Sequence, residues 1–272
     1  MMKVLRIFAG VVFTLMSVSA AFAGGDLKDP YAYTPPPPPA GPYCGGPFSG
    51  FYGGGILGFG GLTSKTTIPA NPPFADANLK ENDRGFTIGG VGGYNWQCNG
   101  RLIGIESDIS YFNADAVGTL NCPSCTTGNP YLSFGSEINW YGTLRGRVGL
   151  LGYENFLVYA TGGLAFGGVD HTMKGGAFNT VVFSKTDSDT QIGWTAGGGA
   201  EYLLSDHWAF RAEALYVDLG SQDQSFTTNA CSGGNCTLRA TYDDSFWVAR
   251  VGLTYLFGGD RAAPAPDYGP LK

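Results

Sequence analysis

The sequence is poor in histidine, the side chain most often used in acid–base catalysis and metal binding. It has two histidines, His171 and His207, and no P-loop, zinc-spaced His/Cys cluster or H-E-x-x-H motif. A Ser/His/acid hydrolase would have to use one of these histidines, and nothing marks a nucleophile for either. His171 and Met173 could together ligate haem iron, but we expect both histidines to be solvated loop residues. We therefore predict no catalytic residue, no cofactor and no metal site.

Positive charge and long apolar runs are also scarce. Beyond residue 23 the chain holds 14 basic and 22 acidic residues, a net charge of −8. No basic stripe is present, so nucleic acid is not an expected partner. No later segment is apolar all round for the roughly 20 residues of a spanning helix. If the mature chain crosses a membrane, it must do so as a closed β-barrel, which the 44 glycines and 14% aromatic residues favour over an α/β enzyme.

The N-terminal segment is typical of an exported protein. Lys3 and Arg6 precede an apolar run over 7–18 that ends in small residues, which predicts a signal peptide over 1–23. A proline-rich segment follows over 24–47 and should be extended polyproline II. We interpret it as a spacer before the first strand, the alternative being a tether to the periplasm or cell wall.

The most informative pattern is period-two alternation. Over residues 137–150, Ile138 and Leu144 fall on an apolar face, whereas Glu137 and Arg145 fall on a polar one. Successive side chains of a strand point to opposite faces. One face suits lipid and the other a polar interior, which indicates a transmembrane β-barrel.

Eight such segments can be delimited. We predict strands over 49–59, 85–97, 102–112, 137–151, 156–167, 191–204, 208–219 and 246–257. Their connections alternate in length, the long ones being 60–84, 113–136, 168–190 and 220–245. Outer-membrane barrels have long extracellular loops and short periplasmic turns. The fold class is thus all-β, an eight-stranded antiparallel up-and-down transmembrane barrel with both termini periplasmic. A soluble β-sandwich would not sort its loops so cleanly.

The polar faces gather charges of both signs. The acids are Glu106, Asp108, Glu137, Glu201 and Glu213, and the bases are Arg145, Arg147, Arg211 and Arg250. An eight-stranded barrel is just wide enough for side chains to fill it, and buried charges must be paired. We predict an ion-pair network that plugs the lumen, with a proton or ion path as the alternative. Aromatic residues near the strand ends predict two interfacial girdles.

Six cysteines suit an oxidising compartment. The topology places Cys44 and Cys98 on the periplasmic side and divides the other four between two extracellular loops. We predict the pairs Cys44–Cys98, Cys122–Cys125 and Cys231–Cys236, while exchange among the last four stays open.

Several segments together resemble a known family. They include Gly50-Phe51-Tyr52-Gly53-Gly54, Trp140-Tyr141-Gly142-Thr143-Leu144-Arg145-Gly146-Arg147, and Gly193-Trp194-Thr195-Ala196-Gly197. Over about residues 48–257 the chain resembles the small outer-membrane "porin family" proteins of alphaproteobacteria, the opacity-like or OmpA-type eight-stranded surface antigens. The resemblance implies an outer-membrane barrel and surface antigen, and some relatives are described as haem-binding. Members commonly end on an aromatic residue that assembly machinery reads, whereas here Phe257 precedes a tail.

We therefore expect four segments: a signal peptide (1–23), a periplasmic linker (24–47), a barrel (48–257) and a periplasmic tail (258–272). The expected function is that of a non-enzymatic, integral outer-membrane protein that presents four extracellular loops. The alternatives are a narrow porin for small solutes and loop-mediated binding of haem or a host surface. Expected partners are outer-membrane lipid, lipopolysaccharide and the barrel assembly machinery, with peptidoglycan or a host surface as further candidates.

Overall fold

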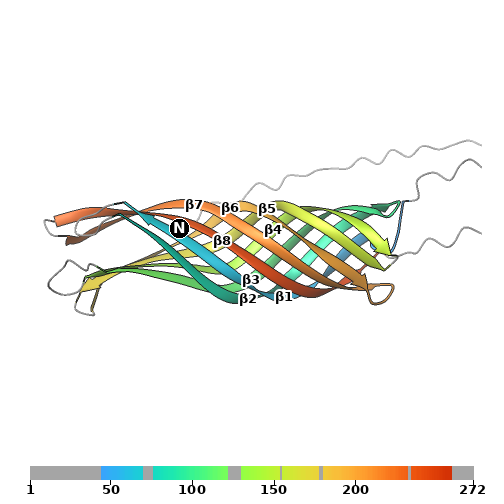
Figure 1. Ribbon diagram of the computed structural model, residues 1–272, viewed down its shortest axis with the longest axis horizontal. Helices are drawn as coiled ribbons and strands as arrows, with labels where there is room; N and C mark the ends of the chain where they lie inside the picture. Colours follow the sequence, from blue (N-terminus) through green and yellow to red (C-terminus); the bar gives the residue numbers. More distant parts are fainter. Residues whose placement is uncertain are drawn as a thin grey trace, which may run out of the picture. The chain divides into compact units, whose positions relative to one another are not determined.

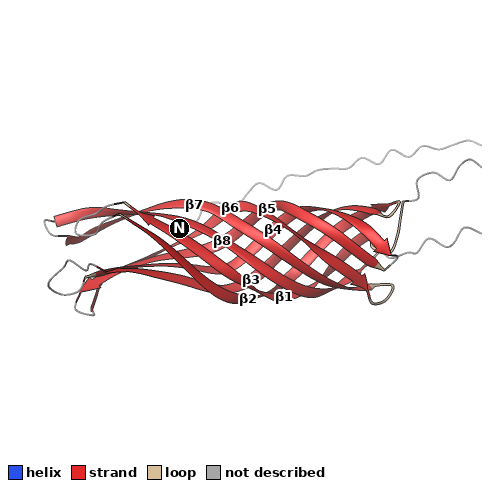
Figure 2. Cartoon of the chain, in the orientation of Figure 1, coloured by secondary structure: helices blue, strands red, loops and turns tan. Residues whose placement is uncertain are grey.

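A computed structural model describes residues 44–69, 76–121, 130–153, 155–177, 180–231 and 234–258. These residues form eight strands: β1 (Gly50–Ile68), β2 (Ala77–Cys98), β3 (Arg101–Asn121), β4 (Tyr131–Tyr153), β5 (Phe156–Ala177), β6 (Thr180–Leu203), β7 (Trp208–Cys231) and β8 (Gly234–Leu256). Each strand pairs antiparallel with the next, and β8 pairs with β1, so the sheet closes (Figures 1 and 2). Within these ranges no helix is long and apolar enough to cross a membrane. The predicted signal peptide, the linker up to residue 43 and the tail beyond residue 258 lie outside the described residues.

The predicted number, order and pairing of the strands are confirmed, but the strands are far longer than predicted. β1 continues to Ile68 and β8 already begins at Gly234, so most of each predicted long loop is a β-hairpin. The sequence signal is weak there because small or polar residues occupy many of the inward positions. In β3, for example, Ala114 and Ala116 are buried between exposed neighbours. We call this end of the barrel the hairpin end, and the end where β1 begins and β8 ends the terminal end.

The predicted separation of faces is confirmed between these extensions. On β3, Ile103 and Ile109 are each 63% exposed, whereas Glu106 is 1% exposed. Contacting aromatic rings form two girdles on the outer face. The ring centres of Phe51 and Tyr94 lie 4.6 Å apart near the terminal end. Those of Trp194 and Tyr216 lie 5.6 Å apart nearer the hairpin end, and we call the girdle at that level the outer girdle. About eight residues separate the two girdles along a strand, which spans roughly 20 Å at the tilt of a barrel strand.

One predicted side-chain orientation is wrong. Glu137 is exposed on the outer face, and Ile138, predicted to face lipid, is completely buried. The cause is an irregularity at Asn139, where the β4–β5 pairing shifts between Ile138 and Trp140. An extra residue in one strand reverses the alternation beyond it. Glu137 is thus removed from the set of lumenal charges.

The barrel wall divides beyond the outer girdle. β6 pairs with β7 only from Trp194↔Asp218 to Leu203↔Ala209, and β2 pairs with β3 only up to Thr87↔Phe112. On β7 the pairing with β8 shifts after Asp218, and Gly220 adopts a φ of +76° that favours glycine. The hairpin end therefore consists of two four-stranded lobes, β7–β8–β1–β2 and β3–β4–β5–β6. Figure 1 shows their strand ends as two groups.

Candidate functional site

Eight buried charged side chains fill the middle of the barrel. They are Glu106 and Asp108 from β3, Arg145 and Arg147 from β4, Glu201 from β6, Arg211 and Glu213 from β7, and Arg250 from β8. Each is at most 5% exposed. Strand alternation directs all of them inward, so the predicted network is confirmed for every member except Glu137. We call this set the charged layer.

The charged layer is paired throughout. Arg250 Nη1 donates to Asp108 Oδ1 at 2.9 Å, and its Nη2 donates to Asp108 Oδ2 at 2.9 Å. Arg147 Nη2 lies 2.7 Å from Glu201 Oε1, and Arg145 contacts Glu106. Four positive charges face four negative ones, which gives a neutral layer. Such closure is necessary because a buried charge without a partner costs several kcal/mol.

Tyr141 accepts a hydrogen bond from Arg250 Nη1 at 3.2 Å, and two further tyrosines, which the alternation of charged residues did not identify, each bond to both an acid and an arginine of the layer. The Tyr52 hydroxyl donates to Glu106 at 2.6 Å and accepts from Arg147 at 2.8 Å. The Tyr159 hydroxyl likewise donates to Glu213 at 2.8 Å and accepts from Arg211 at 2.8 Å. The Arg147 guanidinium also lies 4.0 Å from the centre of the Tyr159 ring, in the range of a cation–π contact.

Glycine provides the space for both rings. Tyr52 pairs across the ladder with Gly93, and Tyr159 pairs with Gly199. A Cβ atom on Gly93 would lie 2.7 Å from Tyr52 Cζ, and one on Gly199 would lie 2.7 Å from the Tyr159 hydroxyl. An inward tyrosine opposite a glycine is thus the signal that could have identified these residues.

Apolar side chains close the lumen on both sides of the charged layer. Towards the terminal end lie Phe48, Leu102, Leu157 and Leu256, each 0–1% exposed. Towards the hairpin end lie Phe112, Ile138, Val169 and Phe246, likewise 0–1% exposed. The interior over this height is filled by packed side chains, as expected for an eight-stranded barrel.

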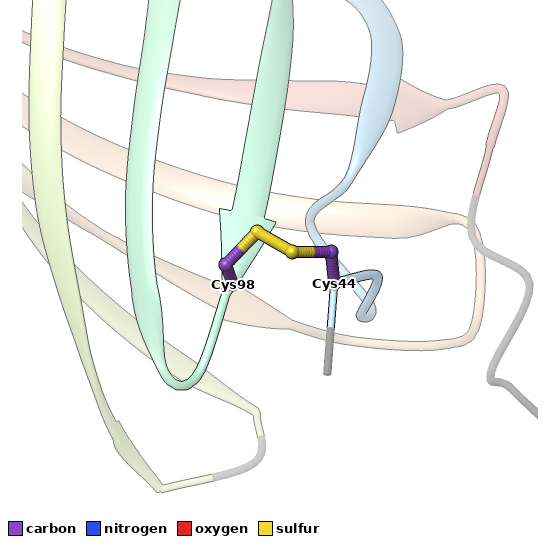
Figure 3. Close-up of a disulfide and its surroundings, with 2 residues drawn as sticks. All are labelled: Cys44 and Cys98. Carbon is purple, nitrogen blue, oxygen red and sulfur yellow. A yellow bond between two sulfur atoms is a disulfide. The ribbon is translucent and has the colours of Figure 1, made fainter. Parts of the chain in front are cut away.

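A disulfide lies at the terminal end. Cys44 and Cys98 are bonded as predicted, so the segment before β1 is joined to the end of β2 (Figure 3). The same segment is held by Phe48 N, which donates to Gln97 Oε1 at 3.2 Å, and by Asn95 Nδ2, which donates to Phe48 O at 3.1 Å. Phe48 is completely buried and closes this end of the lumen. Cys122 and Cys125, and the side chains of Cys231 and Cys236, lie outside what the structure describes.

The prediction for His171 is wrong. It is not a solvated loop residue but a completely buried residue of β5. Its Nε2 donates to Asp244 Oδ2 at 2.8 Å, and its Nδ1 accepts from Gln224 Nε2 at 3.2 Å. Both ring nitrogens are therefore occupied, and neither is free to ligate iron. Met173 is also buried, in an apolar cluster with Phe134. His207 is exposed in the β6–β7 turn, in agreement with its prediction.

The contacts of His171 join the two lobes of the hairpin end. Asp244 and Gln224 belong to the β7–β8–β1–β2 lobe, and His171 and Ser136 belong to the other. Ser136 Oγ donates to Asp244 Oδ1 at 2.9 Å. The His171 ring stacks on the Tyr242 ring, with the ring centres 4.2 Å apart. The pKa of Tyr242 is raised, mainly because the hydroxyl is buried and secondly because Asp244 is negatively charged. We call His171, Asp244, Ser136 and Gln224 the polar clasp.

Comparisons with known proteins agree with this architecture. A model of the family described as outer membrane protein beta-barrel domain matches residues 12–259. The chain is 32% identical to the 31 kDa outer-membrane immunogenic protein of Brucella melitensis, over 89% of this chain and 98% of the relative. It is 29% identical to a 22 kDa outer membrane protein of Rhizobium leguminosarum, over 60% and 63% respectively.

Among solved structures, OprG of Pseudomonas aeruginosa is similar at 17% identity. That match covers 77% of this chain and 97% of OprG with a TM-score of 0.47. The family match spans the whole barrel, and its description agrees with a closed wall that is apolar outside and charged within. The chain therefore belongs to the outer membrane protein beta-barrel domain family and is an integral β-barrel of the outer membrane.

Proposed function

We propose that this protein is a non-enzymatic, structural component of the outer membrane that presents its hairpin end to the exterior. The observation that carries the proposal is the neutral charged layer, in which every charged side chain has a partner of opposite charge and which apolar side chains enclose on both sides. A lumen built in this way stabilises a rigid wall and leaves no open route for ions. Its partners are the surrounding outer-membrane lipid, lipopolysaccharide and, during insertion, the barrel assembly machinery.

The geometry of the polar clasp argues against hydrolysis. A serine nucleophile must bond to the imidazole that takes its proton. Here Ser136 donates to Asp244, and His171 donates to the same carboxylate. All three side chains are at most 1% exposed. The group has the residue types of a catalytic triad but not the connection that would activate the serine.

The alternatives have less support. A porin for small solutes would need a path through the charged layer, where Arg145 alone contacts three carboxylates. Binding of haem through His171 would require breaking two buried hydrogen bonds. Capture of a host surface, or of peptidoglycan by the linker, has no described residue to support it. The relatives named immunogenic support a surface-antigen role for the hairpin end.

Conductance measurement tests the sealed lumen. Purified protein inserted into planar bilayers should give no steady open level, and dye-loaded vesicles containing it should stay closed. A steady conductance from the wild-type protein would contradict the proposal.

Labelling of whole cells tests the orientation. The four described lysines, Lys65, Lys80, Lys174 and Lys185, all lie in the hairpin halves of the strands and are exposed. A membrane-impermeant amine reagent should label these four and spare Lys28 and Lys272. Labelling of Lys28 and Lys272 with protection of the other four would reverse the proposed orientation.

A further inference from the structure

The outer face of the β1–β2 hairpin is basic, although the chain as a whole is acidic. Beyond the outer girdle, side chains at alternate positions of β1 and β2 point outward. The charged ones are Lys65, Lys80 and Arg84, and all three are exposed. The remaining outward residues there are uncharged, such as Thr63 and Asn82, whose side chains bond to each other at 2.8 Å.

The acidic residues of β2 point to the opposite face of the strand. Asp83 faces β3, where its Oδ2 accepts a hydrogen bond from Asp115 N at 2.8 Å. Glu81 also faces β3, and a Cβ atom added to Gly118 would lie 3.0 Å from Glu81 Cγ. Alternation thus separates the charges of β2, with bases outward and acids turned towards the lobe boundary.

The basic side chains form no salt bridge within the described chain. No ion pair involves Lys65, Lys80 or Arg84 among these residues. Lys65 is directly opposite Lys80 in the β1–β2 ladder and opposite Asp243 in the β1–β8 ladder, and the Asp243 carboxylate is bonded by the hydroxyl of Ser221. Like charges at directly opposed positions destabilise a sheet. An anion held between them would remove that repulsion.

The position of these residues identifies the anion. Phe59 and Phe86 are directly opposed on the same hairpin, and both rings are more than half exposed in the outer girdle. Arg84 lies two residues beyond Phe86, roughly 5 Å further along the membrane normal, which is headgroup depth. Lys65 and Lys80 lie six residues beyond the girdle, roughly 15 Å further along the normal, and their long stems can reach back towards it.

We propose that Lys65, Lys80 and Arg84 form a docking surface for the phosphorylated headgroup of an outer-leaflet glycolipid. Arg84 binds a phosphate near the acyl chains, and the lysine pair binds anionic groups on the sugars above it. A guanidinium suits phosphate because its fork makes two parallel hydrogen bonds. The proposal rests on the outward orientation of the hairpin end proposed above, and it adds the residues and the ligand.

The test compares two triple variants with the same change in net charge. The first is Lys65→Gln/Lys80→Gln/Arg84→Gln. The matched control replaces by Gln the exposed basic residues of the other hairpins, Lys174, Lys185 and Arg239. Each purified protein in detergent micelles is titrated with fluorescent core-bearing lipopolysaccharide, and folding is checked by resistance to unfolding in detergent on a gel.

A basic residue at an anionic surface contributes roughly fivefold in affinity at low salt, so the first variant should bind roughly 100-fold more weakly. The control should stay within about threefold of the wild type. Equal affinities for the two variants would overturn the proposal.

A measurement on the wild type alone covers the case in which a variant does not fold. Its affinity should fall with added salt and fall at least about tenfold for the same glycolipid after phosphatase treatment. An affinity that changes with neither salt nor phosphatase treatment would overturn the proposal. If free inorganic phosphate competes with the glycolipid and weakens its binding as much as phosphatase treatment does, the surface binds a soluble anion and the proposal is overturned as well. Because this binding is measured in micelles, it is independent of orientation, which the lysine labelling of whole cells tests separately.

Discussion

Replacing Arg250 by methionine probes the charged layer most directly. Arg250 is 3% exposed and forms two parallel hydrogen bonds with Asp108, each 2.9 Å long. Its Nε also donates to Glu213 at 2.7 Å. The methionine fills much of the same space but leaves four carboxylates facing three guanidinium groups.

The magnitude follows from what remains around the two carboxylates. Removing one partner of a buried ion pair costs about 3–5 kcal/mol. Asp108 keeps Arg145 at 2.9 Å and the Thr143 hydroxyl at 2.5 Å, and Glu213 keeps Arg211 at 3.3 Å. Because these contacts remain, we expect the free energy of unfolding to fall by about 3 kcal/mol, the lower limit of that range. This corresponds to a change of roughly 100-fold in the unfolding equilibrium constant.

The assay is reversible urea unfolding in lipid vesicles, followed by tryptophan fluorescence. The matched control is Arg239→Met, an exposed arginine on the same strand, which should change stability by less than about 0.5 kcal/mol. Arg250→Met/Asp108→Asn restores neutrality and should recover about half of the loss, since coupled neighbours are not additive. Equal small losses for Arg250→Met and Arg239→Met would refute the view that the layer depends on closed pairing.

Three further predictions follow from other contacts. Tyr159→Phe should cost about 1.5–3 kcal/mol, measured in the same unfolding assay, because Glu213 loses a hydrogen bond from a buried hydroxyl; an unchanged midpoint would contradict this role. Cys44→Ser/Cys98→Ser should cost about 2–4 kcal/mol, since the bond closes a loop with a sequence separation of 54; reductant should produce a similar loss in the wild type, and no loss in either would count against the prediction. His171→Ala should raise the rate of amide hydrogen exchange in the parts of β5 and β8 beyond the outer girdle, because the polar clasp joins only the lobes. Exchange in the membrane-spanning part should stay slow. Faster exchange along the whole length of the strands would show instead that the histidine stabilises the entire barrel.

Local alternation alone determines much of the barrel. The period-two pattern of residues such as Ile103 and Glu106 sets which face meets lipid, because successive side chains of a strand must point oppositely. The same rule directs Arg147, Arg211 and Arg250 into one narrow lumen. The count of alternating segments predicts the number of strands, and the short turns between them predict the antiparallel order.

Alternation could not reveal where the pattern breaks. The irregularity at Asn139 reverses the faces of Glu137 and Ile138, and it depends on how β4 meets its neighbour across the ladder. The hairpin extensions were missed for a related reason. Several of their inward positions hold small residues such as Ala114, whose burial follows from the opposing wall and not from their own hydrophobicity.

Only the tertiary structure decided the contacts across the lumen. Tyr52 meets Glu106 and Ser136 meets Asp244 at sequence separations of 54 and 108 residues, distances over which no local pattern carries information. Ring closure brings these strands face to face, and the early end of the β6–β7 ladder creates the lobes that His171 then joins. Single-strand chemistry therefore determined which side chains enter the barrel, whereas the curvature of the closed sheet decided which of them meet.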